Sequence, residues 1–121
     1  MANHRFVHFE IPANDPERLS SFYATLFGWK VEKAPGMDYW LCRTGDGPGI
    51  DGGIMKRADP KQTVTNYVSV DSIEPVLADA KALGATVVVP KSPVPGMGWF
   101  SVALDPQGNP FGMWQEDKSA K

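Results

Sequence analysis

The chain has 121 residues, a formal net charge of −2, and 42% hydrophobic and 21% charged residues, which suits one compact globular domain. Charges of both signs are interspersed, so the sequence offers no basic stripe for nucleic acid, and no apolar segment approaches the roughly 20 residues that span a bilayer. With no apolar run typical of a signal peptide at the start, we expect a cytoplasmic protein that binds neither nucleic acid nor membrane.

The first part of the chain predicts a strand followed by a helix. Residues Arg5–Ile11 alternate in polarity, which places His8 and Glu10 on the face opposite the one that packs against the helix. Asp15 is typical of a helix N-cap, and Gly28 predicts the C-terminal end of the helix. The apolar residues that recur at helical spacing are Leu19, Phe22, Tyr23, Leu26 and Phe27.

Three short strands are expected to follow this helix. They lie at Trp29–Lys33, Tyr39–Thr44 and Ile50–Lys56, and turns rich in glycine and proline separate them. The polar segment Arg57–Gln62 then predicts a connector. The first half of the chain therefore has the predicted order βαβββ.

The second half repeats this order. A strand is predicted at Asn66–Val70, Asp71 and Glu74 resemble a capping box, and Gly84 is expected to end the helix. Residues 90–98 are rich in proline and glycine, so they predict an irregular loop over the mouth of a cavity. The three remaining strands are expected at Ala85–Val89, Gly98–Leu104 and Pro110–Gln115.

The repeated order predicts an internal duplication. With the first strands of the two halves aligned, His8 falls against Tyr67, and Gly53 falls against Gly112 at the same spacing. Two similar modules would face one shared cavity, so equivalent positions can be compared for chemistry. The modules are expected at about residues 4–57 and 63–117 of a single domain, 1–121.

These features resemble the vicinal oxygen chelate superfamily, which includes glyoxalase I, extradiol dioxygenases and bleomycin-resistance proteins. The segments HFEI, FYATLFGW, YVSV and DPQGNPFGMWQ carry the resemblance, which covers nearly the whole chain. It implies an α+β fold of two tandem βαβββ modules whose curved mixed sheets enclose a pocket, and it implies a homodimer. Members that hold a metal place ligands on the first and last strands of each module, at positions that here fall on His8, about Gly53, Tyr67 and about Gly112.

Those four positions make a catalytic metal unexpected. A divalent ion typically needs about three side chains with nitrogen, oxygen or sulfur donors, and glycine supplies none. A phenol is a poor ligand because it is normally protonated near neutral pH. We therefore predict no metal and no other cofactor. A divalent ion at His8, in a site rearranged to use Glu10 or Glu116, stays an alternative.

His8 and Glu10 are the candidate catalytic residues. An imidazole changes protonation near neutrality, and a carboxyl group whose pKa is raised by burial can act as an acid or a base. The alternatives are structural: a histidine hydrogen-bonded to a neighbour, and an ion pair of Glu10 with Arg5, Arg43 or Lys56.

Further side chains are candidates for contact with a ligand. Aromatic residues supply large contact areas in pockets, although any one of them could pack in the core or in a dimer interface instead. The single cysteine, Cys42, is expected to be a buried packing residue. The predicted ligand-binding residues are Trp40, Met55, Tyr67, Ser69, Trp99 and Trp114.

Three functions are consistent with this pattern. The first is a protein that binds a small organic molecule in an aromatic-lined pocket without a catalytic metal, of the sequestration or resistance type. The second is a glyoxalase-like lyase, an isomerase or a dioxygenase with an atypical or metal-free site that uses His8 and Glu10. The third is an interaction module whose cavity has collapsed.

Overall fold

The computed structural model describes residues 3–121, and the chain forms two compact units. The first unit contains residues 8–65, and the second contains residues 66–121 together with residues 3–7. The start of the chain belongs to the second unit because the amide of Ser69 donates to the carbonyl of Arg5 at 2.9 Å.

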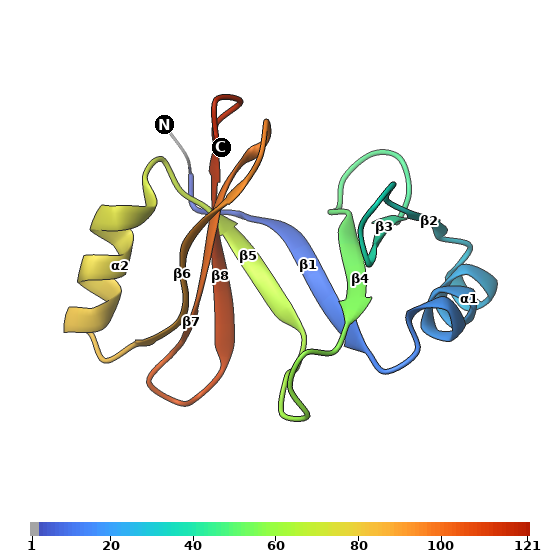
Figure 1. The fold of residues 1–121 in the computed structure, drawn as a ribbon, viewed down its shortest axis with the longest axis horizontal. Helices are drawn as coiled ribbons and strands as arrows, with labels where there is room; N and C mark the ends of the chain where they lie inside the picture. Colours follow the sequence, from blue (N-terminus) through green and yellow to red (C-terminus); the bar gives the residue numbers. More distant parts are fainter. Residues whose placement is uncertain (1–2) are drawn as a thin grey trace. The chain divides into compact units, whose positions relative to one another are not determined.

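The first unit has the order βαβββ and one four-stranded sheet (Figure 1). Its strands lie in the order β2-β3-β4-β1, with β1 parallel to β4 and the other neighbours antiparallel. The helix α1 packs on one face of this sheet. The elements are β1 (Phe6–Ala13), α1 (Pro16–Phe27), β2 (Lys30–Lys33), β3 (Tyr39–Arg43) and β4 (Gly52–Lys56).

The helix α1 begins and ends where the sequence predicts. The side chain of Asp15 accepts a hydrogen bond from the amide of Arg18 at 3.1 Å, which satisfies one of the free donors of the first turn. Gly28 ends the helix in the left-handed region, with φ at 75°. The core beneath the helix is built on the buried residues Ala13, Cys42 and Ile54.

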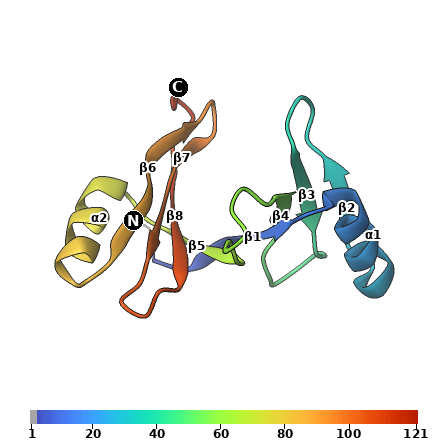
Figure 2. The ribbon, with the colours of Figure 1, turned by 60° about the horizontal axis from the view of Figure 1, so that its bottom comes forward.

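The second unit repeats the order βαβββ (Figure 2). Its strands lie in the order β5-β8-β7-β6, with β5 parallel to β8 and the other neighbours antiparallel. Its core holds Val70, Ile73, Ala103 and Met113, between α2 and the sheet. The elements are β5 (Thr65–Ser69), α2 (Ile73–Ala82), β6 (Thr86–Val94), β7 (Gly98–Leu104) and β8 (Pro110–Glu116).

The start of α2 differs from the sequence prediction. The N-cap is Ser72 rather than Asp71, and its side chain makes no capping hydrogen bond. The amide of Ile73 donates instead to Oε1 of Gln115 at 2.9 Å. The predicted capping box of Asp71 and Glu74 is therefore wrong, because Ser72 is the N-cap and an acceptor from strand β8 satisfies the amide of Ile73.

The predicted loop at residues 90–98 is also wrong over its first part. Strand β6 continues through Pro90 and Pro93 to Val94. Because β6 is at the edge of its sheet, a proline there need not interrupt the ladder, and the register shifts between Val89 and Ser92.

The predicted α+β class with two βαβββ units is confirmed. In the part of the chain that the structure describes, no helix is both long enough and apolar enough to cross a membrane.

Candidate functional site

The site in the first unit lies on the sheet face that α1 does not cover. Phe9 and Ile11 pack against the core beneath α1, so the alternation of β1 directs His8 and Glu10 to the opposite face. Both side chains are half-buried. The predicted placement of the two candidate residues on one face is thus observed.

Tyr39, from β3, joins these two residues through hydrogen bonds. Its Oη lies 2.5 Å from Nε2 of His8 and donates to Oε2 of Glu10 at 3.0 Å. A phenol can donate only one hydrogen bond, and Tyr39 donates it to Glu10. In the other hydrogen bond Nε2 of His8 must therefore carry the proton and donate to Oη of Tyr39. The network of His8, Tyr39 and Glu10 therefore favours one tautomer of the imidazole and one orientation of the carboxylate.

Burial holds the pKa of His8 below its usual value of 6.5. The negative charges of Glu10 and Asp51 act in the opposite direction and do not outweigh the loss of solvation. The neutral imidazole is therefore the favoured form at neutral pH. A neutral imidazole can accept a proton from a ligand or substrate.

Tyr39 also occupies the space beside Gly53 on β4. A Cβ atom at Gly53 would lie 2.1 Å from Oη of Tyr39. The antiparallel register places Tyr39 opposite Met55, so its ring reaches diagonally over the glycine. A glycine inside a strand often marks such a close approach.

An equivalent contact occurs in the second unit. Tyr67 on β5 lies directly opposite Gly112 on β8, and a Cβ atom at Gly112 would lie 2.3 Å from Cδ2 of the ring. Tyr67 is only 5% exposed. The ring therefore fills the space that a side chain at position 112 would need.

The residues at the four positions where the resemblance implies ligands do not fit a divalent metal. His8 is hydrogen-bonded to a phenol, Gly53 and Gly112 lack donors, and a tyrosine covers each glycine. Within residues 3–121, no group of three or more His, Cys, Asp or Glu side chains is arranged to hold a metal ion. The side chains at these positions are thus suited to hydrogen bonding and not to coordination of a metal.

Four of the predicted ligand-binding residues lie on the sheet faces that the helices leave open. Met55 shares the face of Gly53 in the first unit, since Ile54 between them is in the core. In the second unit, Ser69 lies opposite Trp114, and both are on the same sheet face as Tyr67. Their contact with a ligand stays a prediction.

Trp40 and Trp99 lie on the other side of their sheets. Trp40 packs against the core of the first unit, with Nζ of Lys33 at 5.7 Å from its ring. Trp99 packs against the core of the second unit, and its Nε1 donates to Oδ2 of Asp117 at 3.1 Å. This placement favours the packing interpretation for both tryptophans.

The thiol of Cys42 is not a candidate nucleophile. The residue is 1% exposed, and burial raises the pKa of its thiol to about 11. At neutral pH it is therefore a protonated packing group, as the sequence suggested.

Sequence reasoning missed Tyr39. A signal was present, because Gly53 is inside a strand whose antiparallel neighbour begins with an aromatic residue. The contact between Tyr39 and Gly53 was not predicted because Tyr39 lies on β3, whereas the equivalent positions in the two halves were those on the first and last strands.

Comparisons with known proteins agree with this architecture. A family model described as "Glyoxalase-like domain" matches residues 7–113. Proteins named "Putative glyoxylase CFP32" from Mycobacterium bovis and Mycobacterium tuberculosis are 31% identical over 109 residues. The match covers 84% of this chain and 40% of those proteins, so the chain spans about two fifths of their length.

Solved structures show the same fold. A glyoxalase/bleomycin resistance protein/dioxygenase superfamily member from Vibrio splendidus has a TM-score of 0.64 at 18% identity, over 95% of this chain and 100% of that one. Methylmalonyl-CoA epimerase from Mycobacterium tuberculosis has a TM-score of 0.68 at 12% identity, over 96% of this chain and 89% of that one. These solved structures share the fold, and the family match over residues 7–113 shows that the chain belongs to the glyoxalase-like domain family.

Proposed function

We propose that this protein binds a small organic molecule, and that it does so through hydrogen bonds rather than through a divalent metal. The observation that carries the proposal is the network of His8, Tyr39 and Glu10 on the open sheet face of the first unit. It presents an imidazole, a phenol and a carboxylate together, at a place where the glycine Gly53 leaves room for the phenol.

The network suits recognition of a polar group on an otherwise apolar molecule. Its hydrogen bonds fix the three side chains before a ligand arrives, which lowers the entropic cost of binding. Met55 and Leu41 share this sheet face and supply apolar contact beside the polar groups. The second unit places the half-buried Trp114 on the sheet face that α2 leaves open, so aromatic contact is available there too.

A thermal-shift screen with a library of small organic molecules tests this proposal. We expect compounds that raise the melting temperature of the wild-type protein to lose that effect in Tyr39→Phe and Glu10→Gln. Glu32→Gln is the matched control, because Glu32 is an exposed carboxylate on β2 of the same sheet. Hits that stabilise the two network variants as well as the wild type would contradict the proposal.

Proton transfer is the second candidate function, and the same network favours it. A neutral His8 can take a proton from an acidic C–H group, and the imidazolium that forms is stabilised by Glu10 through Tyr39. This corresponds to an isomerase or lyase with a metal-free site. The observation that separates it from simple binding is turnover.

Exchange of carbon-bound protons in deuterium oxide measures that turnover. We would incubate the protein with carbonyl compounds that carry an acidic α-proton and follow the loss of the α-proton NMR signal. Catalysis by the network predicts loss of exchange in His8→Ala and Glu10→Ala. Unchanged exchange in both variants would remove these residues as the acid and base.

We further propose a cytoplasmic homodimer of the sequestration type, as the family resemblance suggests. Light scattering after size exclusion would test the dimer, with a monomer mass as the contradicting result. Fractionation of the source cells would test the location.

A further inference from the structure

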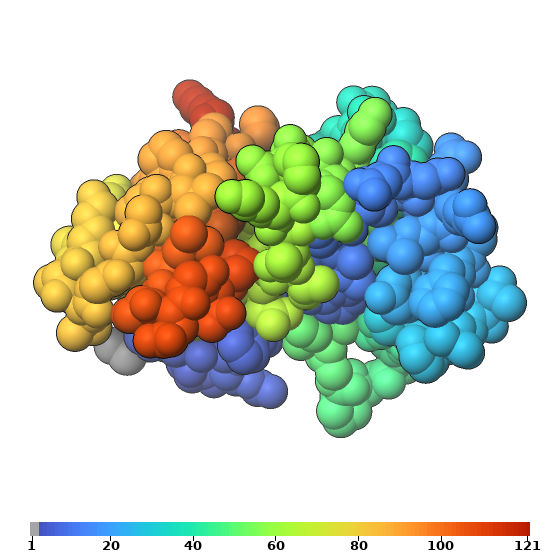
Figure 3. All heavy atoms as spheres, turned by 90° about the horizontal axis from the view of Figure 1, so that it is seen from below, coloured from blue at the N-terminus to red at the C-terminus, as the bar shows by residue number. Residues whose placement is uncertain are grey.

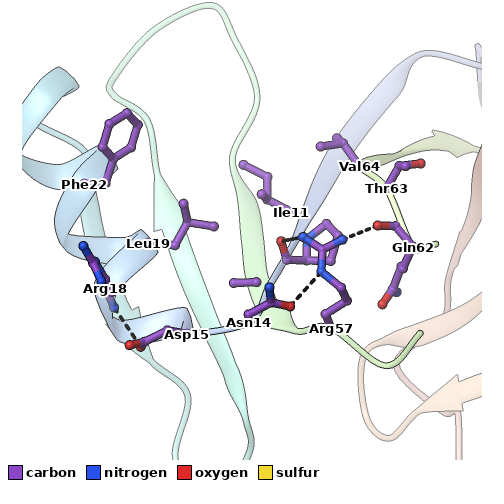
Figure 4. Close-up of a pocket in the computed structure, with 12 residues that line it drawn as sticks. Ile11, Asn14, Asp15, Arg18, Leu19, Phe22, Arg57, Gln62, Thr63 and Val64 are labelled. Carbon is purple, nitrogen blue, oxygen red and sulfur yellow. Dashed lines mark hydrogen bonds between the residues drawn. The ribbon is translucent and has the colours of Figure 1, made fainter. Parts of the chain in front are cut away.

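A second candidate binding site lies in the first unit, away from the network described above. A pocket of about 620 Å³ is present between the start of α1 and the segment that connects the two units (Figure 4). None of its lining residues belongs to the network or to the predicted ligand-binding set. We propose that this pocket binds a small carboxylate that carries an alkyl or aryl group.

The wall of the pocket is apolar. Its apolar lining includes Ile11 from β1, Leu19 and Phe22 from α1, and Val64 from the connecting segment. Phe22 is 54% exposed and Val64 is 49% exposed, so large apolar side chains stand in water on either side of the opening. A ligand with an apolar body would cover this surface, and the volume lies within the range of small-molecule sites.

Arg57 gives the pocket a fixed positive charge. Its Nε donates to Oδ1 of Asn14 at 3.0 Å, its Nη1 donates to the carbonyl of Gln62, and its Nη2 donates to the carbonyl of Pro12 at 3.3 Å. All three acceptors are uncharged, so they hold the guanidinium in place without neutralising it. A guanidinium has five N–H donors, and these bonds leave two for a ligand.

Among the described residues, no carboxylate forms an ion pair with Arg57. Arg18 also lines the pocket, and the one acidic lining residue, Asp15, already caps α1. Asp59 lies in the adjoining hollow, where it accepts from the amide of Lys61 at 2.8 Å. The ion pairs found among residues 3–121 are Lys33–Asp38 and Lys91–Glu74, neither of which involves the pocket.

Two arginines, one aspartate and an apolar wall therefore define the ligand chemistry. A carboxylate can accept two N–H groups from one guanidinium, which is the strongest neutralising contact available to Arg57. Figure 3 shows the connecting segment, in light green, beside the blue residues at the end of β1 and the start of α1. The exposure of Phe22 and Val64 shows that the pocket reaches the solvent.

NMR titration of the ¹⁵N-labelled full chain with octanoate tests the proposal. Acetate carries the same head group without the body, and 1-octanol carries the body without the charge. We expect octanoate to shift the signals of Leu19, Val64 and the Arg57 side chain, and to bind at least about tenfold more tightly than either control. Equal affinity for octanoate and octanol would show an apolar surface only and overturn the carboxylate assignment.

Variants locate the binding. Arg57→Gln should weaken octanoate binding about tenfold, and Arg57→Lys should restore part of it because the charge returns. Val64→Trp fills the pocket and leaves the hydrogen bonds of Arg57 in place, so it should also abolish binding. If Arg57→Gln does not fold, Val64→Trp decides the matter, and retained affinity in that variant overturns the proposal.

The same titration separates this site from the network. His8→Ala and Tyr39→Phe should leave octanoate affinity unchanged if the pocket at Arg57 is the site. Octanoate shifts confined to His8, Glu10 and Tyr39 would assign the carboxylate to the network instead and would overturn the second site without affecting the proposed function.

Discussion

The two units place a tyrosine over a glycine at equivalent places, but they use different strands to do so. In the first unit Tyr39 comes from β3, and the hydroxyl end of its ring, with Oη, Cζ and Cε1, lies over Gly53. In the second unit Tyr67 comes from β5, directly opposite Gly112, and the base of its ring covers the glycine. The first arrangement brings a hydroxyl to His8 and Glu10, whereas the second fills space.

The pairing of strands also changes the correspondence between the units. Glu10 lies opposite Gly53, and Tyr67 lies opposite Gly112, so by register the counterpart of Tyr67 is Glu10 rather than His8. The alignment of the sequence and the alignment of the strand register differ by one repeat of the β-pleat. His8 and Glu10 therefore lie on the same face of the strand. The two units therefore share the face and the glycine, while the first unit has polar groups there and the second has an aromatic group.

The largest expected effect is from adding a methyl group at the two glycines. Gly112→Ala should destabilise the protein by about 3 kcal/mol, because the base of the Tyr67 ring cannot move without shifting the strand. Gly53→Ala should cost less, about 2 kcal/mol, because the end of the Tyr39 ring can swing away only by giving up its hydrogen bonds to His8 and Glu10. Urea unfolding measures both.

A double variant sharpens this test. Tyr67→Ala removes the ring, so Gly112→Ala should cost much less in that background, and the two changes should not be additive. Additive losses in free energy of unfolding would show that the ring is not what requires glycine at position 112.

The next effect concerns the network of the first unit. Tyr39→Phe removes the hydroxyl that links His8 and Glu10, and it should lower the free energy of unfolding by about 1–2 kcal/mol. Tyr23→Phe is the control, since Tyr23 packs against the core of the same unit away from the network. Equal losses in the two variants would indicate that the hydrogen bonds contribute nothing specific.

The third effect is the contribution of His8 to the pH dependence of the free energy of unfolding, which should be lost when His8 is replaced. Because the folded pKa is lower than the usual 6.5, the folded state is favoured in full above pH 6.5 and loses stability as the pH falls through the folded value. The loss cannot exceed about 1.4 kcal/mol for each unit of pKa difference. Melting temperatures of the wild type and His8→Gln between about pH 7.5 and pH 5 should therefore converge toward acid.

The smallest effect concerns Cys42. Its buried thiol, with a pKa of about 11, should react slowly with iodoacetamide in the folded protein and rapidly in denaturant. Mass spectrometry of the alkylated protein measures both rates. Fast labelling of the folded protein would place the thiol at the surface.

Local signals in the sequence were sufficient for the fold. Alternation in β1, the cap at Asp15 and the glycine at position 28 act within a few residues, so each could be recognised without tertiary information. The errors at Ser72 and Pro90 arose where a distant partner decided the structure: Gln115 supplied the cap, and the edge position of β6 tolerated the prolines.

The candidate site was only partly predictable for the same reason. The placement of His8 and Glu10 on one face follows from the two-residue pleat, but the hydrogen bonds depend on a ring that comes from another strand. Trp40 and Trp99 were predicted as pocket residues by residue type, whereas the pleat placed both toward the cores. Which face a strand buries must be known before residue type indicates a role.

Native mass spectrometry of the protein purified without a chelator tests the central claim most directly, because it weighs a bound molecule and a bound metal together. The network of His8, Tyr39 and Glu10 predicts an adduct with the mass of an organic compound that disappears in Tyr39→Phe, and no stoichiometric divalent ion. One equivalent of a divalent metal that is lost in His8→Ala would contradict this account.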